Sequence, residues 1–403
     1  MTSIPFELRS TPTSRTPGSV PGVRERWRMG VEARALVLVT AVLLAVGLAT
    51  VFSASFIEAQ QKGFGATYYL SRHAIAAAAG IVGFAILAKL DAERFRPLAW
   101  PMMWASLGMM ALVLLAGKIN GSQRFAFGRS FQPSEFVKFA VVCWTAMMIV
   151  RKGERLRRFA KGVIPIMLVN GLLALLAFKQ PDVSVALFYL ALAGTLLFMA
   201  GARIGHFLVL GALVLPLAWQ KLDGYVVARL CDFAPGTFSF VCVTTPEEAQ
   251  RKADIGLQQY ESLVALGSGG LTGVGYAEGR TQSGFLPHQI SDFIASNIGE
   301  EWGFLGLAVV TLLYAAYGWL GFRIARDARS QFLQLVAVGC TLTTVTTAFV
   351  HLAVVTGLFP NTGLTLPFIS HGGSNMLLSL AMTGVLVNIG SARERVAADP
   401  LPR

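Results

Sequence analysis

Three carboxylates within ten residues are the groups in this sequence most suited to chemistry. Asp292 lies between a turn marked by Pro287 and an apolar helical run, and Glu300 and Glu301 come just before a longer apolar run. Carboxylates at the mouth of a membrane are costly unless they are partnered or functional. A functional role for Asp292 and a role as the N-cap of a short helix both stay open, and the two glutamates could complement a helix dipole.

A glycine-rich segment, residues 265–280, lies just upstream of these carboxylates. An open glycine backbone can approach a ligand closely or bind an anion through its N–H groups. The segment lacks the GK[ST] of a phosphate-binding loop, and it is not a dinucleotide fingerprint between a strand and a helix. Close approach to a ligand and a merely flexible loop both remain open.

Two further polar pairs interrupt the apolar pattern. Glu135 and Lys138 begin an apolar run three residues apart, so they share one helix face and could form a simple ion pair. Gln180 and Asp182 form a sharp turn between two apolar runs, where the aspartate could be only a helix cap.

Residues 357–375 contain two prolines, several glycines, and the polar side chains Ser370, His371 and Ser374. Broken backbone at membrane depth is tolerated only where it is buried in protein or faces a cavity. The segment therefore predicts a cavity beside the last apolar run. A lone histidine is more often part of hydrogen-bonded structure than a ligand.

The composition is that of an integral membrane protein. The 403 residues are 54% hydrophobic and only 14% charged, whereas soluble domains carry roughly 25% charged residues. The mean hydropathy is +0.59. The net charge of +12 is interpreted as basic cytoplasmic loops that set topology, rather than as a nucleic-acid surface.

Ten apolar runs predict an all-α polytopic membrane protein of about ten transmembrane helices. The predicted runs are 35–54, 73–89, 98–117, 134–150, 163–179, 183–200, 204–220, 302–323, 332–356 and 373–390. Basic residues recur in every second connection, beginning with the N-terminal tail, so both termini are predicted to be cytoplasmic. The chain divides into a disordered tail 1–34, a membrane domain 35–392 with a long extracytoplasmic loop 221–301, and a short cytoplasmic tail 393–403.

This topology places Arg124 on the outer side, against the charge trend, where it would invite an anionic partner such as a lipid phosphate. Cys231 and Cys242 lie in the long outer loop, eleven positions apart. A disulfide is permitted outside the cell, and two free thiols are an equal alternative. No cleavable signal peptide is expected, because residues 1–30 lack an apolar core.

Four blocks of sequence, in the same order, closely resemble the FtsW/RodA family, also called SEDS proteins. The resemblance covers nearly the whole chain after about residue 35. The blocks comprise Gly121, Arg124, Gln132, Pro133, Ser134, Glu135 and Lys138; Gln180, Pro181 and Asp182; Leu286, Pro287, Asp292, Phe293, Ile294, Gly299, Glu300, Glu301, Gly303 and Gly306; and Pro360, Thr362, Gly363, Leu364, Leu366, Pro367, Phe368, Ile369, Ser370, Gly372, Gly373 and Ser374.

Departures from the family pattern are few. Ser291 replaces a usual threonine, His371 a common tyrosine, and Glu261-Ser262 a Gln-Ser pair. The long N-terminal tail and the FSAS segment, Phe52 to Ser55, are more similar to FtsW, the division member, than to RodA, the elongation member.

The resemblance implies a peptidoglycan glycosyltransferase that polymerises lipid II at the outer face of the bacterial cytoplasmic membrane. It implies Asp292 as the general base, with cations such as Arg124, Lys138 and Arg280 near the leaving diphosphate. The remaining residues expected at the substrate site are Glu135, Gln180, Asp182, Glu261, Ser262, Glu300, Glu301, Ser370, Gly372, Gly373 and Ser374. No cofactor motif is present, although a divalent cation such as Mg or Mn could share the charge.

Expected partners are lipid II, the nascent glycan strand, a single-pass class B penicillin-binding transpeptidase and other division or elongation membrane proteins, with no nucleic acid. Two alternatives remain open: a flippase that moves lipid II across the membrane, and a scaffold that recruits a transpeptidase. A flippase should not need a carboxylate on an outer loop, and a scaffold should tolerate its loss.

Overall fold

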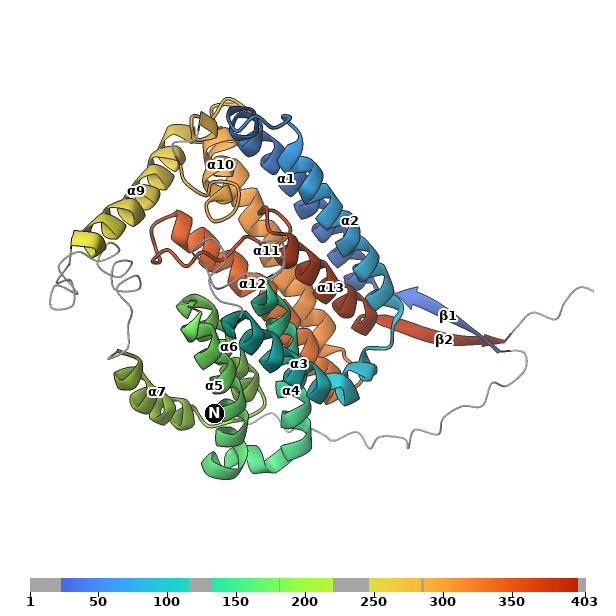
Figure 1. Ribbon diagram of the computed structural model, residues 1–403. Coiled ribbons are helices and arrows are strands. Elements are labelled where there is room, and N and C mark those ends of the chain that lie inside the picture. The colour runs from blue at the N-terminus through green and yellow to red at the C-terminus, as the bar shows by residue number, and fades with distance from the viewer. Residues whose placement is uncertain (1–22, 116–131, 181, 220–245, 284–285, 398–403) are drawn as a thin grey trace, which may run out of the picture.

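The computed structural model describes residues 23–115, 132–180, 182–219, 246–283 and 286–397 (Figure 1). These residues form an elongated helical bundle with one short pair of strands at one end. The long helices are α1 (Val31–Gln61), α2 (Tyr68–Lys89), α3 (Phe95–Leu115), α4 (Pro133–Lys152), α5 (Ile164–Lys179), α6 (Val183–Met199), α7 (Ile204–Trp219), α9 (Pro246–Gly269), α11 (Gly303–Arg326), α12 (Gln331–Val355) and α13 (Gly373–Ile389).

Each of the ten predicted apolar runs coincides with one of these helices, and only α9 among them lies outside the runs. Within the described residues, seven helices are long and apolar enough to cross a membrane. Val183–Met199 and Gly373–Ile389 are shorter apolar helices. The protein is thus an all-helical polytopic membrane protein apart from its strand pair, and the count of ten crossings stays a prediction.

The strands differ from the sequence-based expectation for the two tails. β1 (Val23–Met29) pairs antiparallel with β2 (Ser391–Ala397), although residues 1–34 were expected to be disordered. The reason is proximity: the Gly30 N–H donates to the Gly390 carbonyl at 3.1 Å, so both tails leave the bundle together. Two extended segments that start side by side can continue as a ladder.

The described part of the long loop 221–301 is partly helical. It contains α9, the 3-10 helix η4 (Thr281–Ser283) and the short helix α10 (Ile294–Glu301), which leads directly into α11. Figure 1 places α9 and α10 at the end of the bundle away from the strands. The carboxylate-bearing segment therefore lies at the opposite end from the strand pair.

Small residues let the helices and loops approach closely, as is usual in membrane bundles. Gly384 of α13 faces the Phe84 backbone of α2, and a Cβ there would lie 2.6 Å from the Phe84 carbonyl oxygen. Gly47 of α1 faces the irregular segment before α13 in the same way. A Cβ on Gly47 would lie 2.4 Å from the Phe368 carbonyl oxygen and 2.7 Å from the Ile369 Cα.

We expect Gly47→Ala to lower the melting temperature in detergent, because the added methyl group must push residues 368–369 away from α1. Overpacking of this kind costs about 1–3 kcal/mol. Gly108→Ala is the matched control, since a Cβ at Gly108 meets nothing within 4 Å and alanine favours a helix by roughly 1 kcal/mol. Equal melting temperatures for the two variants would show that the α1 contact does not constrain the segment.

Candidate functional site

The loop that carries Asp292 is held by the segment before α13. The Ser370 hydroxyl donates to the Ser291 carbonyl at 2.6 Å and accepts from the Leu366 N–H at 2.8 Å. The His371 N–H donates to the Ile290 carbonyl at 2.9 Å. We call these contacts the backbone clamp. They join two blocks that lie about eighty positions apart in the sequence.

The Asp292 carboxylate is not a helix cap. The N-cap of α10 is Phe293, and no side chain caps that helix. The backbone of Asp292 is bonded instead, its N–H donating to the His288 carbonyl at 3.0 Å. Within the described residues the half-buried carboxylate has no hydrogen bond or ion pair of its own. Its oxygens are therefore available to accept a proton.

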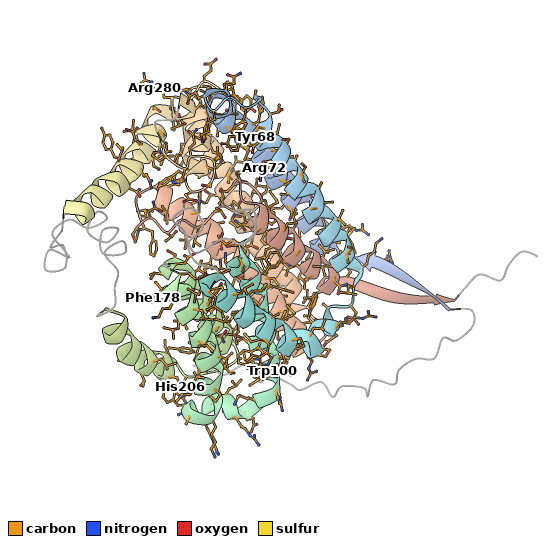
Figure 2. All side chains as sticks on the ribbon, viewed as in Figure 1. Tyr68, Arg72, Trp100, Phe178, His206 and Arg280 are labelled. Carbon is orange, nitrogen blue, oxygen red and sulfur yellow. The ribbon has the colours of Figure 1, made fainter. Side chains whose placement is uncertain are left out.

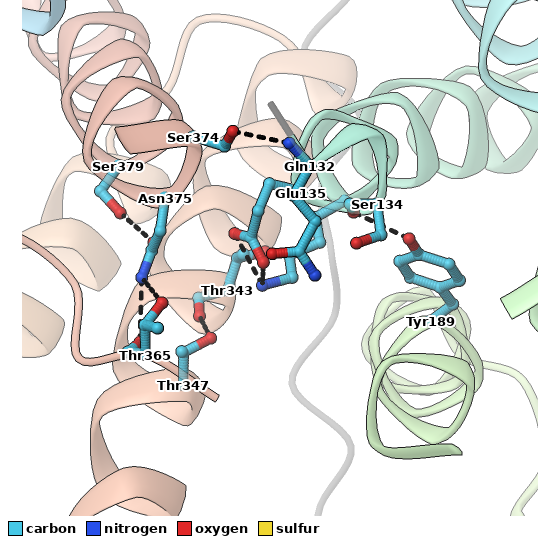
Figure 3. Close-up of polar contacts among 11 residues, drawn as sticks. Gln132, Ser134, Glu135, Tyr189, Thr343, Thr347, Thr365, Ser374, Asn375 and Ser379 are labelled. Atoms are coloured by element: carbon cyan, nitrogen blue, oxygen red, sulfur yellow. Dashed lines mark hydrogen bonds and ion pairs between the residues drawn. The ribbon is translucent and has the colours of Figure 1, made fainter. Parts of the chain in front are cut away.

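A buried ion pair occupies the start of α4, as the three-residue spacing predicts. The Lys138 ammonium lies 2.8 Å and 2.9 Å from the two Glu135 carboxylate oxygens (Figure 3). Both side chains are almost fully buried. The ammonium also lies 5.1 Å from the centre of the Phe188 ring. Both carboxylate oxygens and two of the three ammonium N–H groups are thus hydrogen-bonded within the pair. A buried ion pair needs such hydrogen bonds, because no water is present to replace them.

The start of α13 joins this ion pair to the backbone clamp. The Gln132 N–H, just before α4, donates to the Ser374 hydroxyl at 2.8 Å (Figure 3). The Asn375 amide donates to the Thr365 carbonyl at 2.9 Å. Residues 366–375 therefore contact the Asp292 loop at one end and the α4 terminus at the other. Asn375 and Thr365 were missed at the level of sequence, although both adjoin a family block.

The turn between α5 and α6 packs on the same region. The Gln180 amide donates to the Met110 carbonyl of α3 at 2.8 Å, and Asp182 is buried. The Tyr189 hydroxyl donates to the Ser134 carbonyl at 2.7 Å. The carboxylates of Asp182 and Glu135 both interact electrostatically with this tyrosine. Asp182 is thus brought near the α4 ion pair.

The Glu300 and Glu301 carboxylates are buried and accept hydrogen bonds from residues of the loop and of α1. Glu300 accepts from the N–H groups of Arg280 and Thr281 at 2.9 Å and 3.1 Å, and from the Thr281 hydroxyl. Glu301 accepts from the Ser53 hydroxyl at 2.5 Å and from the Gln282 amide at 2.6 Å. Only 1% and 2% of the two glutamates is exposed. Protein donors already surround both carboxylates, and their contact with substrate stays a prediction.

The glycine-rich segment lies against the junction of α10 and α11. The Val274 and Gly275 N–H groups donate to the Glu300 and Glu301 carbonyls, at 3.0 Å and 3.2 Å. A Cβ on Gly273 would lie 2.1 Å from the Glu301 carbonyl oxygen. The glycines are therefore needed for close backbone packing, which neither of the sequence-based alternatives named.

The other expected residues are dispersed. Ser262 is buried and joins helices, its hydroxyl lying 2.8 Å from that of Ser296 and 2.9 Å from the Val355 carbonyl. Glu261 is partly exposed and Arg280 is exposed, and Figure 2 shows Arg280 at the end of the bundle away from the strands. Gly372 is the N-cap of α13 and Gly373 its first residue. Arg124, Cys231 and Cys242 lie outside the described residues.

The described residues do not bring together three metal-binding side chains of the His, Cys, Asp or Glu type. A protein-held site for Mg or Mn therefore does not fit the described part of the chain.

Comparison with known proteins gives one consistent match. The profile of the FTSW_RODA_SPOVE family, described as cell cycle protein, matches residues 34–395. A protein of Trichlorobacter lovleyi named probable peptidoglycan glycosyltransferase FtsW is 35% identical over 376 residues, which cover 92% of this chain and 96% of that one. The stage V sporulation protein E of Bacillus subtilis is 33% identical over 362 residues, covering 88% and 95%.

Solved structures agree with the sequence matches. One similar chain comes from a structure described as "Structural coordination of polymerization and crosslinking by a peptidoglycan synthase complex". It aligns with a TM-score of 0.69 and 26% identity, and the alignment covers 89% of this chain and 97% of that one. The rod shape determining protein RodA of Thermus thermophilus aligns with a TM-score of 0.60 and 25% identity, covering 88% and 95%.

Burial raises the pKa of the Glu301 carboxyl above its ordinary value, against hydrogen bonds from Ser53 and Gln282 that lower it. A raised folded-state pKa gives stability that is present below the unfolded pKa and is lost as pH rises through the folded one. We therefore expect Glu301→Gln, which keeps an acceptor oxygen for both donors, to raise the melting temperature near pH 7.5. The gain should shrink as the pH falls below the folded pKa.

Thermal unfolding of both proteins across pH 5 to 8 checks this expectation. A difference in melting temperature that does not change with pH would contradict it.

Proposed function

This chain belongs to the FtsW, RodA and SpoVE family and is a peptidoglycan glycosyltransferase, and we propose that it polymerises lipid II at the outer face of the cytoplasmic membrane. The observation that carries the proposal is the Asp292 carboxylate. It lies on a loop fixed by the backbone clamp, and it is unpartnered among the described residues. A fixed loop with a free carboxylate is what a general base requires.

The proposed step transfers one glycan chain. The Asp292 carboxylate takes the proton from the 4-hydroxyl of the acceptor sugar. That oxygen forms a bond to the anomeric carbon of the growing strand, while the bond from the same carbon to the lipid diphosphate breaks. The undecaprenyl diphosphate leaves with the bonding electron pair, so its negative charge increases, and nearby cations lower the barrier.

Lys138 can take part without leaving its partner. An ammonium group has three donors, and Glu135 accepts at 2.8 Å and 2.9 Å through its two oxygens. One N–H is then left for a phosphate oxygen. Arg280, exposed beside the loop, and Arg124 are the other proposed cations. Glu300, Glu301 and Ser262 position the loop and the helices around it.

Three features support the wider setting. The strands β1 and β2 lie together at one end of the bundle and the loop that leads into α10 at the other, in accord with cytoplasmic termini and an outer site. The synthase complex among the solved relatives supports partnership with a single-pass class B transpeptidase. The FtsW names of the relatives and the description of the family as cell cycle protein favour division over elongation.

Replacing Asp292 by asparagine or alanine should lower glycan polymerisation from purified lipid II by about 10²–10⁴-fold, because the step loses its base. Polymer formation by the purified protein with its cognate transpeptidase is the measurement. Asp327→Asn is the control, since Asp327 lies on an exposed turn between α11 and α12. Full activity in a folded Asp292→Ala variant would remove this residue from the mechanism and favour transport or scaffolding.

Ser370→Ala should lower polymerisation while Asp292 is intact, because the Ser291 carbonyl and the Leu366 N–H lose their common partner. Leaving buried polar groups unsatisfied costs about 1–3 kcal/mol. Ser106→Ala is the matched control: its buried hydroxyl bonds only the Met102 carbonyl of its own helix, at 2.8 Å. Equal activity in the two variants would show that the clamp does not position the base.

A further inference from the structure

A cluster of aromatic rings and cations lies where α1 turns into α2. The rings of Phe64 and Tyr68 stack with centroids 4.3 Å apart and planes 10° apart, and Tyr69 meets Tyr68 edge-on at 5.2 Å. The Arg72 guanidinium lies 5.7 Å from the centre of the Tyr68 ring and donates to its hydroxyl at 2.9 Å. We call Phe64, Tyr68, Tyr69 and Arg72 the outer aromatic cluster.

This cluster is continuous with the catalytic loop. The Tyr69 ring contacts the His371 ring edge-on, with centroids 5.7 Å apart. The His371 N–H is part of the backbone clamp, donating to the Ile290 carbonyl two residues before Asp292. Figure 2 shows Tyr68 and Arg72 near the end of α2 that lies away from the strand pair. The cluster therefore adjoins the loop on the side toward α2.

Among the described residues the Arg72 guanidinium forms no salt bridge with a carboxylate. The neighbouring Lys62 is paired with Glu58 at 2.5 Å. Among the described residues Arg72 meets only the Tyr68 hydroxyl and ring, and no carboxylate. Burial first and Arg72 second lower the pKa of His371, while Glu58 raises it, so the charge of Arg72 acts on the clamp together with that of Glu58. A cation without a carboxylate on the outer side runs against the charge trend of membrane proteins and calls for an anionic partner.

The cluster is also open to a ligand. Phe64 is 45% exposed and Arg72 is exposed, while Tyr68 and Tyr69 are half-buried. Aromatic faces are electron-rich, so they attract the C–H groups on the flat face of a sugar ring. A row of such faces beside a free guanidinium suits an acidic oligosaccharide, whose sugars can stack while an acidic substituent accepts charge-assisted hydrogen bonds.

We propose that the outer aromatic cluster is a subsite for the growing glycan strand, holding sugars beyond the one that reacts at Asp292. The inference rests on the proposed polymerase function and names where the product strand is held. Phe64 stacks against a sugar ring through the face that lies away from Tyr68, Tyr68 holds Phe64 and Arg72 in place, and Arg72 binds an acidic group carried by the strand. A strand retained here stays beside the loop between successive additions, which favours long products.

A binding measurement tests the subsite apart from catalysis. The probe is a soluble, lipid-free peptidoglycan glycan of several disaccharide units that keeps its acidic substituents. Affinity is measured on the full-length protein carrying Asp292→Asn, in detergent. We expect Tyr68→Ala and Arg72→Gln each to weaken binding by about tenfold, which corresponds to ~1.4 kcal/mol. Phe359→Ala is the matched control, since Phe359 is also 45% exposed and follows α12.

Product length gives a second measurement in the chain with Asp292 intact. Arg72→Gln should shorten the glycan strands made from lipid II, while the rate of forming the first bond falls less than threefold. Loss of all polymer with Asp292→Ala, together with unchanged strand length in Arg72→Gln, would overturn the subsite and leave the polymerase intact. Unchanged polymerisation in Asp292→Ala would instead overturn the proposed function.

The competing explanation is an aromatic belt that anchors α2 at the bilayer surface. In that case Tyr68→Ala, Arg72→Gln and Phe359→Ala should leave glycan affinity unchanged and lower the melting temperature in vesicles to a similar extent. That result would overturn the proposal. Weaker glycan binding in the two cluster variants alone, at unchanged melting temperature, would support it.

Discussion

The Ser370 hydroxyl bonds at once to the Leu366 N–H and the Ser291 carbonyl, and the site depends on this double contact. Irregular backbone beside a bilayer has no water to satisfy it, so each polar group needs a partner within the protein. The clamp supplies partners to two irregular segments at the same time. Gly47 lets the segment that contains Ser370 pack closely against α1. The packing against this first long helix therefore helps to fix the position of the Asp292 loop.

Three carboxylates that look alike in the sequence are separated by their surroundings. Glu300 and Glu301 are surrounded by hydroxyl, amide and backbone donors, and the Glu301 pKa is raised by burial. Asp292 is half-buried and keeps its oxygens unbonded among the described residues. The first two therefore stabilise the loop, and the third is the one to which we assign proton exchange in the proposed mechanism. The different roles proposed for the three carboxylates follow from their surroundings, and residue type alone could not distinguish them.

Local signals were predictable and long-range partners were not. The apolar runs locate ten helices, because a bilayer imposes length and hydropathy on each one independently. The Glu135–Lys138 pair also follows from spacing within one helix. The bond from Ser53 to Glu301 joins residues 248 positions apart, so no pattern near either residue reveals it. The strand pair was missed for the same reason, since its formation requires that α1 and α13 bring the tails together.

The buried pair of Glu135 and Lys138 raises the question of why the fold retains it. Removing two charges from water often costs more than their attraction returns, so such a pair is weak evidence of stability. Its two hydrogen bonds leave one ammonium proton without a carboxylate partner. Glu135 holds the Lys138 ammonium in place through both of its carboxylate oxygens, at 2.8 Å and 2.9 Å. Under the proposed mechanism, a leaving diphosphate would meet a cation that is already oriented, so little reorganisation would remain for the moment of reaction.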